Sequence, residues 1–319
     1  LTQATITYSA DPTGSFANGV SIWTGFGEDT VSIDGTFDRN GIRNFTTLNT
    51  GLGDDVVTVD LDVSEDGLFV LNTQGPWNDY PTISDNDTVL AASSTLPLIV
   101  FGGQGDDNIT GGSSDDIIFG DRGRVLSHEV LNVDGVPTST IVESHGSGGP
   151  DDMTDGAIRI YDEFISIDHE VGGNDTIDAG EGDNLVVGGF GNDIITTGSG
   201  EDVVVGDNGA ATYAVGTDQL LQVTATDTTN LTGGNDVIDV GEGDNTVLGG
   251  VGADTVTAGA ADDALPANNL VIGDNGTVTY VTATTTTLTG TVVAGDTWTL
   301  DLVVNGVKTQ FTYAVPLTG

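Results

Sequence analysis

Acidic or amide side chains recur at intervals of nine residues in the middle of this chain. In residues 171–209 the repeated positions are Asp175, Asn184, Asp193 and Asp202. A glycine-rich stretch precedes each one and a short aliphatic run follows, as in GGFGNDIIT at 188–196. Glycines allow a tight bend with positive φ and leave main-chain carbonyls uncovered. Oxygen ligands alone, on a flexible bend, favour Ca²⁺ over Mg²⁺ or Zn²⁺.

Two such nonapeptides make one coil of about 18 residues, so residues at that interval lie on neighbouring coils, roughly 4.8 Å apart. This register places Asp175 over Asp193 and Asn184 over Asp202. Bare carboxylates at that separation repel each other and raise each other's pKa. A hard cation between them reverses the sign of the interaction, whereas an Asn supplies only a neutral oxygen. We therefore predict Ca²⁺ between stacked turns, with Asp175 and Asp193 as the strongest pair.

Further copies of the pattern lie on both sides of this stretch. Residues 233–276 repeat it, a tandem pair occupies 102–119, and single turns occupy 24–32 and 50–58. Together with the central copies, they give the candidate metal ligands Asp29, Asp55, Asp107, Asp116, Asp175, Asn184, Asp193, Asp202, Asp236, Asn245, Asp254 and Asp263.

The second block has its own predicted register, with Asp236 over Asp254 and Asn245 over Asp263. Three copies close in GDRG or GDNG. These tails have two equal interpretations: turn caps, because Asn and Gly tolerate positive φ, or the completion of a last metal site. Their carboxylates are Asp121, Asp207 and Asp274.

These motifs resemble the RTX, or haemolysin-type, calcium-binding repeat, GGxGxDxUx, in which U is a large aliphatic residue. GGFGNDIIT, GGQGDDNIT and GGVGADTVT match it. The resemblance implies a right-handed parallel β-roll with Ca²⁺ between successive turns, in an exported bacterial protein. Residues 1–125 also look like very large, repetitive RTX surface proteins.

The chain departs from the family pattern at several positions. Asn replaces Asp at 184 and 245, Ser114 replaces Gly, and Ala261 replaces Gly. The single turns at 24–32 and 50–58 have no partner at the usual interval. We expect sites there to be weak, incomplete or empty.

The predicted fold is all-β and elongated, with short right-handed parallel β-roll blocks alternating with antiparallel hairpin or sandwich-like elements. No segment has a sustained helical period. Inward-facing apolar residues are expected at Ile177, Val186, Ile195, Val204, Ile238, Val247, Val256 and Leu265. The predicted regions are 1–100, β-rich with isolated turns; 101–123, a short roll block; 124–171, a hairpin turning at Asp134–Gly135 and a loop; 172–209, a roll block; 210–232, a Thr-rich connection; 233–276, a roll block; and 277–319, a hairpin around Asn305–Gly306 that joins a next repeat or subunit.

Composition narrows the classes of partner. The chain has 49 Asp and Glu against 6 Lys and Arg, a formal charge of −43. Nucleic acids and anionic lipids would be repelled, whereas cations would be attracted. There is no cysteine, and no apolar stretch is long enough for a transmembrane helix. We interpret the chain, from Leu1 to VPLTG, as a segment of something longer or a processed product.

Catalytic signatures are missing from the sequence. It contains no HExxH zinc motif and no GxSxG nucleophile elbow, and the pair Asp54–Asp55 sits at repeat positions. We expect His128, His145 and His169 on the surface. Trp77 and Tyr80 are interpreted as a packed loop, with a small sugar-stacking patch as the alternative.

The expected function is therefore structural, with no enzymatic activity. We predict a calcium-binding extracellular module of a giant repetitive bacterial surface protein, adhesin or fibre, at the cell surface or in the matrix. Strand-like ends at 4–8 and 307–315 would pair with tandem copies or subunits. A cell-surface or matrix component is expected as a further partner. The alternative is a calcium-dependent secretion and folding module of an RTX exoenzyme or toxin.

Overall fold

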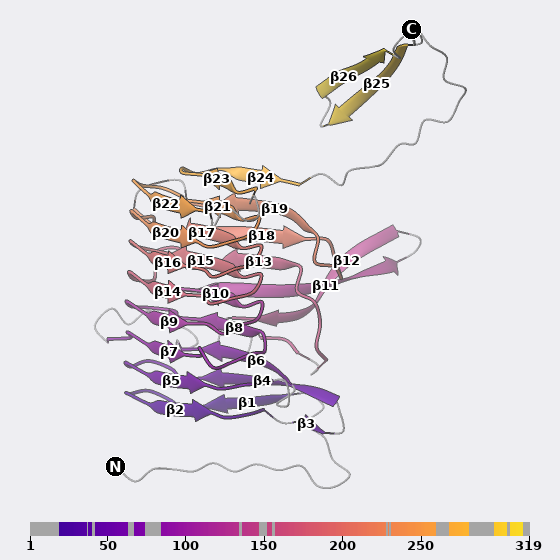
Figure 1. Ribbon diagram of the computed structural model, residues 1–319. Helices are drawn as coiled ribbons and strands as arrows, with labels where there is room; N and C mark the ends of the chain where they lie inside the picture. The colour runs from indigo at the N-terminus through magenta and orange to yellow at the C-terminus, as the bar shows by residue number, and fades with distance from the viewer. Residues whose placement is uncertain are drawn as a thin grey trace. The chain divides into compact units, whose positions relative to one another are not determined.

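The computed structural model describes residues 19–36, 38–39, 42–62, 67–73, 84–133, 136–146, 152–154, 157–227, 229, 231–259, 268–280, 297–304 and 307–314. Residues 1–280 form one compact unit and residues 281–319 form a second. The first unit contains two parallel sheets and one antiparallel sheet (Figure 1). No helix occurs among the described residues, and so none there could cross a bilayer.

The two parallel sheets are the walls of a roll, and the chain passes from one to the other in each coil. The first, here called the outer sheet, consists of β2 (Thr30–Ile33), β5 (Val56–Val59), β7 (Thr88–Leu90), β9 (Asn108–Thr110), β14 (Thr176–Asp178), β16 (Ile194–Thr196), β20 (Val237–Val240) and β22 (Thr255–Ala258), in that order. The second, here called the covered sheet, consists of β1 (Val20–Trp23), β4 (Ile42–Asn49), β6 (Gly67–Asn72), β8 (Leu98–Phe101), β10 (Ile117–Phe119), β15 (Leu185–Gly189), β17 (Val203–Asp207), β21 (Thr246–Leu248) and β23 (Leu270–Ile272), with β3 (Asp38–Arg39) antiparallel to β4.

The antiparallel sheet is made by the insertions between roll coils. Its order is β12 (Val136–His145), β11 (Gly123–Val133), β13 (Glu163–Ser166), β18 (Gly209–Tyr213), β19 (Leu220–Ala225) and β24 (Thr277–Thr279). The predicted hairpin at 134–135 is confirmed, since Val133 pairs with Val136. The second unit contains the predicted C-terminal hairpin of β25 (Thr297–Val304) and β26 (Val307–Ala314), in which Val304 pairs with Val307.

The alternation of side chains explains why the two walls differ in composition. In β16 only Ile195 is buried, while Ile194 and Thr196 face solvent. All residues of β15 and β17 are buried. One face of the covered sheet packs inside the roll, and the other belongs to a cluster that includes Phe164, Ala211 and Val223 of the antiparallel sheet. A strand that is buried on both faces has a continuous run of apolar residues, whereas a half-exposed strand alternates apolar and polar residues.

Pairing between coils runs through all the predicted blocks without interruption. Strand β10 pairs with β15 and β9 pairs with β14, although the whole 124–171 insertion lies between them in sequence. The turns at 24–32 and 50–58, predicted as isolated, stack on each other, because β2 pairs with β5 and β5 with β7. The coils therefore share one interior core, which contains the described apolar residues predicted to face inward, except that Val256 is partly buried and packs against it. Leu265 lies outside the described residues.

The surface prediction for His145 is wrong. Its side chain is 1% exposed and stacks on Phe45 with ring centroids 4.2 Å apart. Its Nε2 lies 2.8 Å from Glu143 Oε1, and Glu143 also accepts hydrogen bonds from Arg159 and Tyr161. The antiparallel sheet buries this polar group against the roll, a contact that local sequence does not reveal. Trp77 and Tyr80 lie outside the described residues.

Replacing Ile195 with alanine tests the assignment of wall faces. Ile195 is fully buried in the roll core, and its neighbours across the sheet are Ile177 and Ile238. Ile195→Ala should lower the free energy of unfolding by about 2–5 kcal/mol, as measured by denaturant titration in saturating Ca²⁺. The matched control is Ile194→Ala, because Ile194 is 50% exposed. Equal losses for the two variants would contradict the assignment.

Candidate metal centres

The roll has two edges, where turns join its walls. At the first edge, here called the aspartate edge, turns lead from the covered sheet to the outer sheet and end in aspartate. Its residues are Asp29, Asp55, Asp87, Asp107, Asp175, Asp193, Asp236 and Asp254. At the opposite edge, here called the mixed edge, the corresponding residues are Asp116, Asn184, Asp202, Asn245 and Asn269.

One oxygen of each stacked carboxylate at the aspartate edge is used by the backbone. The main-chain N–H of Asp175 donates to Asp193 Oδ1 at 2.8 Å, and that of Asp193 donates to Asp236 Oδ1 at 2.8 Å. The predicted stacking of Asp175 on Asp193 and of Asp236 on Asp254 is confirmed. The same bond joins successive aspartates from Asp29 to Asp254, with N–H to oxygen distances of 2.7–3.0 Å.

The second oxygen of these carboxylates is buried without a hydrogen-bond partner. This holds for Oδ2 of Asp55, Asp87, Asp107, Asp175, Asp193, Asp236 and Asp254. An unpaired buried carboxylate oxygen is costly unless a donor or a cation reaches it. The ladder thus leaves a row of acceptors along one edge.

Glycines make room beside these free oxygens. A Cβ built on Gly188 would lie 2.5 Å from Asp193 Oδ2 and would also collide with the carbonyl oxygen of Gly206 on the next coil. Gly102, Gly120, Gly206 and Gly249 have the same relation to the free oxygens of Asp107, Asp175, Asp236 and Asp254. Each position therefore combines a free carboxylate oxygen with a main-chain carbonyl oxygen. Hard oxygen donors of both kinds are what Ca²⁺ takes.

Four carboxylates of this row, those of Asp107, Asp175, Asp193 and Asp236, are hard to ionise without a cation. Burial, the largest cause, raises the pKa of Asp175 and of Asp236 to about 8. Burial and the neighbouring charge of Asp175 raise the pKa of both Asp107 and Asp193 well above the usual value. Within the described residues no three acidic or histidine side chains converge on one point. Main-chain carbonyls must therefore complete any coordination shell. With those carbonyl ligands included, the residues present fit Ca²⁺.

The mixed edge has no such free carboxylate oxygen among its described residues. Asn184 Oδ1 accepts the N–H of Asp116, and its Nδ2 donates to the carbonyls of Gly180 and Gly182 at 3.3 and 2.9 Å. Asn245 repeats this arrangement with Asp202, Gly241 and Gly243.

The two aspartates of the mixed edge are satisfied by other donors. Asp116 Oδ1 and Oδ2 accept the N–H groups of Leu98 and Gly112. Asp202 Oδ1 and Oδ2 accept the N–H of Asn184 and the hydroxyl of Thr197. The predicted stacking of Asn184 on Asp202 is confirmed, but every terminal atom of the pair already has a partner in the protein.

The predicted stacking of Asn245 on Asp263 is wrong. The N–H of Asn245 donates to Asn269 Oδ1 at 3.0 Å, and β21 pairs with β23, which begins at Leu270. The coil is longer here, so the residue at the usual interval is not the one that stacks. Asp263 lies outside the described residues.

The GDRG and GDNG tails mark where the chain leaves the roll. Asp121 accepts the N–H groups of Gly173 and Phe190, and Asp207 accepts those of Gly234 and Val251. Each therefore caps the returning turn and the next one, which supports the turn-cap interpretation for these two. Asp274 is exposed at the last coil.

The first coils depart from the glycine pattern. Thr24, Thr50 and Thr73 stand where later turns have glycine, and each hydroxyl donates to a carbonyl of the next coil. Asp29 is half-buried, while Asp55 is buried with a free Oδ2.

Sequence reasoning missed Asp85 and Asp87, both buried with a free Oδ2. The stretch NDTVL resembles the turn ends NDTID and ADTVT, a signal that could have found Asp87, but the preceding glycines are missing.

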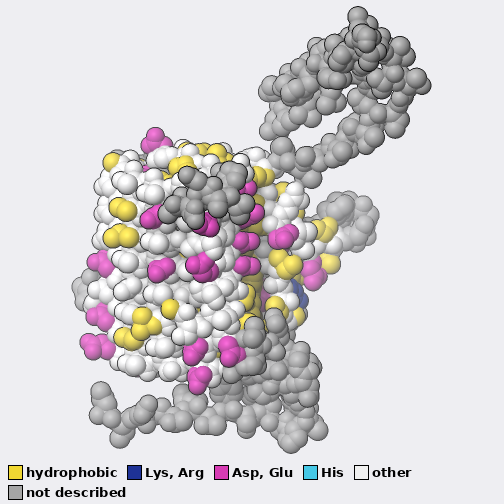
Figure 2. Space-filling view, in the orientation of Figure 1, with side chains coloured by type: hydrophobic (Ala, Val, Ile, Leu, Met, Phe, Trp, Pro, Cys, Tyr) yellow, Lys and Arg dark blue, Asp and Glu magenta, His cyan; other side chains and the backbone are white. Residues whose placement is uncertain are grey.

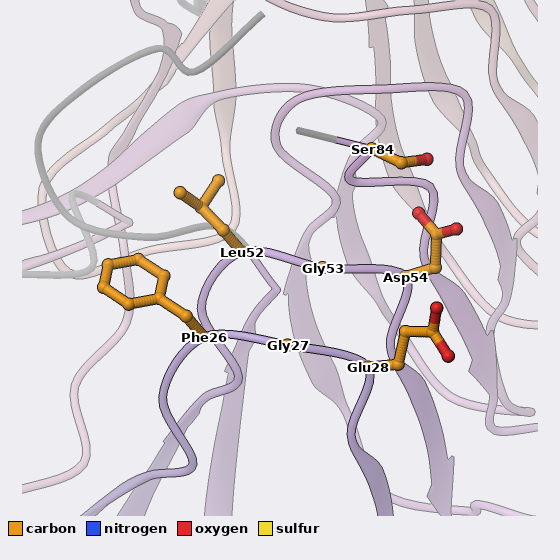
Figure 3. Close-up of a pocket in the computed structure, with 7 residues that line it drawn as sticks. All are labelled: Phe26, Gly27, Glu28, Leu52, Gly53, Asp54 and Ser84. Atoms are coloured by element: carbon orange, nitrogen blue, oxygen red, sulfur yellow. The ribbon is translucent and has the colours of Figure 1, made fainter. Parts of the chain in front are cut away.

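A pocket in the first coils includes Asp54, but not Asp55, in its lining. It is lined by Phe26, Gly27, Glu28, Leu52, Gly53, Asp54 and Ser84, and the two glycine turns lie one above the other in Figure 3. Asp54 is exposed whereas Asp55 is buried. The neighbouring carboxylates therefore do not face one substrate position as a glycosidase dyad would.

Acidity should favour the calcium-free fold. The pKa of Asp87, Asp175 and Asp236 is about 8 in the folded chain, above the usual 3.8, so the folded chain binds more protons between about pH 4 and pH 8. Stability without Ca²⁺ is then present at low pH and is lost as pH rises through this window. Thermal unfolding in calcium-depleted buffer should show a lower Tm at about pH 8 than at about pH 5. Saturating Ca²⁺ at the higher pH is the control, and a Tm independent of pH without Ca²⁺ would contradict the prediction.

Comparison with known families agrees with this geometry. The family model described as RTX calcium-binding nonapeptide repeat matches four copies, at residues 99–124, 171–204, 179–212 and 231–265. Searches of curated proteins and of solved structures gave no match. The matched segments contain the turns that present Asp107, Asp193 and Asp254 with their glycines. These four segments of the chain therefore carry the RTX calcium-binding nonapeptide repeat, and such repeats bind Ca²⁺ in a β-roll.

Proposed function

We propose that this chain is a calcium-rigidified structural module of a large, repetitive bacterial surface protein, adhesin or extracellular fibre. The observation that carries the proposal is the row of buried, unpartnered carboxylate oxygens along the aspartate edge. These groups shape the scaffold itself and do not surround a substrate-sized site. That placement supports a structural role for these groups.

Calcium supply would control the order of this scaffold. The chain has 48 glycines, whose ordering costs more backbone entropy than that of other residues, and its formal charge of −43 opposes compaction. Acidic side chains are spread over the face seen in Figure 2. Extracellular modules typically bind Ca²⁺ with Kd values of about 10⁻⁴–10⁻³ M. The module would stay loose in a low-calcium cytoplasm and become rigid outside the cell, which suits a secreted protein.

Strand edges at the ends of the chain would support assembly. The roll begins with the edge strands β1 and β2 and ends with β22 and β23, and β26 is an edge strand of its own hairpin. Exposed edges pair readily with further strands. Tandem copies or subunits would join there, and the predicted edge at 307–315 corresponds to β26. The predicted edge at 4–8 lies outside the described residues.

A calcium-dependent secretion and folding module of an exoenzyme or toxin is the second candidate. It is favoured by the repeats themselves, because RTX repeats are typical of secreted bacterial proteins. The full-length coding sequence separates the two. Many further copies of this pattern would support the surface protein, whereas a single protease, lipase or toxin domain would support the alternative.

Removal of calcium tests the rigid-scaffold proposal directly. After exhaustive chelation, far-ultraviolet circular dichroism should lose most of its β signal, and limited proteolysis should cut within the roll. Adding Ca²⁺ should restore both, because metal binding contributes folding free energy. Mg²⁺ at the same concentration is the control and should restore little, since it demands a stricter octahedral site. An unchanged β spectrum after chelation would rule the proposal out.

A further inference from the structure

The two edges of the roll differ in whether their carboxylate oxygens lack hydrogen-bond partners, and the repeat motif alone does not show this difference. We propose that Ca²⁺ lines only the aspartate edge, between Gly102 and Gly273, and that the mixed edge is held by protein hydrogen bonds in place of metal. The proposal rests on the proposed calcium-dependent scaffold and specifies which residues bind the ion.

On the aspartate edge, every turn in this range has a buried carboxylate oxygen that could bind a cation. The side chains of Asp107, Asp175, Asp193 and Asp236 are 1–2% exposed, and their Oδ2 atoms have no hydrogen-bond partner. Asp254 continues the row with a buried Oδ2 of the same kind. Each of these oxygens lies beside a glycine that leaves room for an ion, as described for Gly188.

On the mixed edge, side-chain amides stand where a cation would be needed. Nδ2 of Asn184 donates to the carbonyls of Gly180 and Gly182, and Nδ2 of Asn245 donates to those of Gly241 and Gly243. The amide hydrogens thus satisfy the turn carbonyls that a calcium ion would otherwise bind. A neutral amide also removes the charge that would attract the ion.

In the mixed-edge turns that end at Asn184, Asp202 and Asn245, the first residue is not glycine and fills the remaining space. Ala179 and Val240 are fully buried in the roll core, and Thr197 donates its hydroxyl to Asp202 Oδ2 at 2.7 Å. On the aspartate edge the same position is Gly188, Gly206 or Gly249. Gly111 is the glycine exception on the mixed edge, but Asp116 beside it accepts two main-chain N–H groups. Metal binding is therefore confined to one side of each coil.

A pair of matched substitutions tests this directly on the full chain. Asp193→Asn and Asp202→Asn make the same chemical change within one coil, on opposite edges. Calcium titration by calorimetry, with bound metal counted by native mass spectrometry, should show that Asp193→Asn loses at least one ion or weakens binding about tenfold. Asp202→Asn should bind as much calcium as the unaltered chain, with an affinity within about twofold. Equal losses in the two variants would overturn the proposal.

A gain-of-site variant keeps the proposal testable if Asp193→Asn fails to fold. Asn184→Asp removes the amide that satisfies Gly180 and Gly182 and adds a carboxylate, so it should bind additional calcium. An unchanged calcium count in a folded Asn184→Asp protein would overturn the idea that the amide takes the place of the ion. If the unaltered chain binds no calcium, the proposed scaffold function itself fails. If it binds calcium equally through both edges, only the one-sided row fails.

Discussion

A column of buried carboxylates, spaced by a single strand separation, is the constraint on which the rest of this roll depends. The parallel ladder sets that spacing, and each aspartate strengthens the ladder by accepting the N–H of the neighbouring coil, as Asp193 does for Asp175. The same geometry leaves the other carboxylate oxygen buried and unpaired. Repulsion between such groups grows as coils are added, so the regularity that orders the backbone also creates the need for cations. The ion removes the cost that stacking creates, so calcium binding contributes free energy to folding.

The same edge also accommodates the insertions. Asp121 and Asp207 stand at the points where the chain leaves the roll, and each offers both oxygens to N–H groups of turns that lie ahead. These caps let a long excursion begin and end without loss of register between β10 and β15, or between β17 and β21. The excursions then build the antiparallel sheet, which covers the outward face of the covered sheet and buries the Glu143–His145 pair. The outer sheet keeps one face exposed, where apolar side chains such as Ile194 lie among polar ones such as Thr196.

The two edges of the roll differ in what holds their turns together. Where Asn184 and Asn245 satisfy the turn carbonyls, the roll holds itself together without metal. Where Asp175, Asp193 and Asp236 face glycine carbonyls, order depends on calcium. In such a roll, calcium would act at one side of each coil, and the order of the coil would depend on that side.

The sequence by itself determined the all-β fold, the parallel coils and the inward-facing residues such as Ile177 and Ile195, because glycine turns and strand alternation are local properties. It also determined the chemistry, since the carboxylates, carbonyls and glycines of one turn are consecutive. Only the tertiary structure decided which turns stack when the interval is irregular, as for Asp55 on Asp87 or Asn245 on Asn269. It alone decided which oxygens remain free, because the partners of a buried carboxylate come from the neighbouring coil, and loop length between coils is not encoded in the motif.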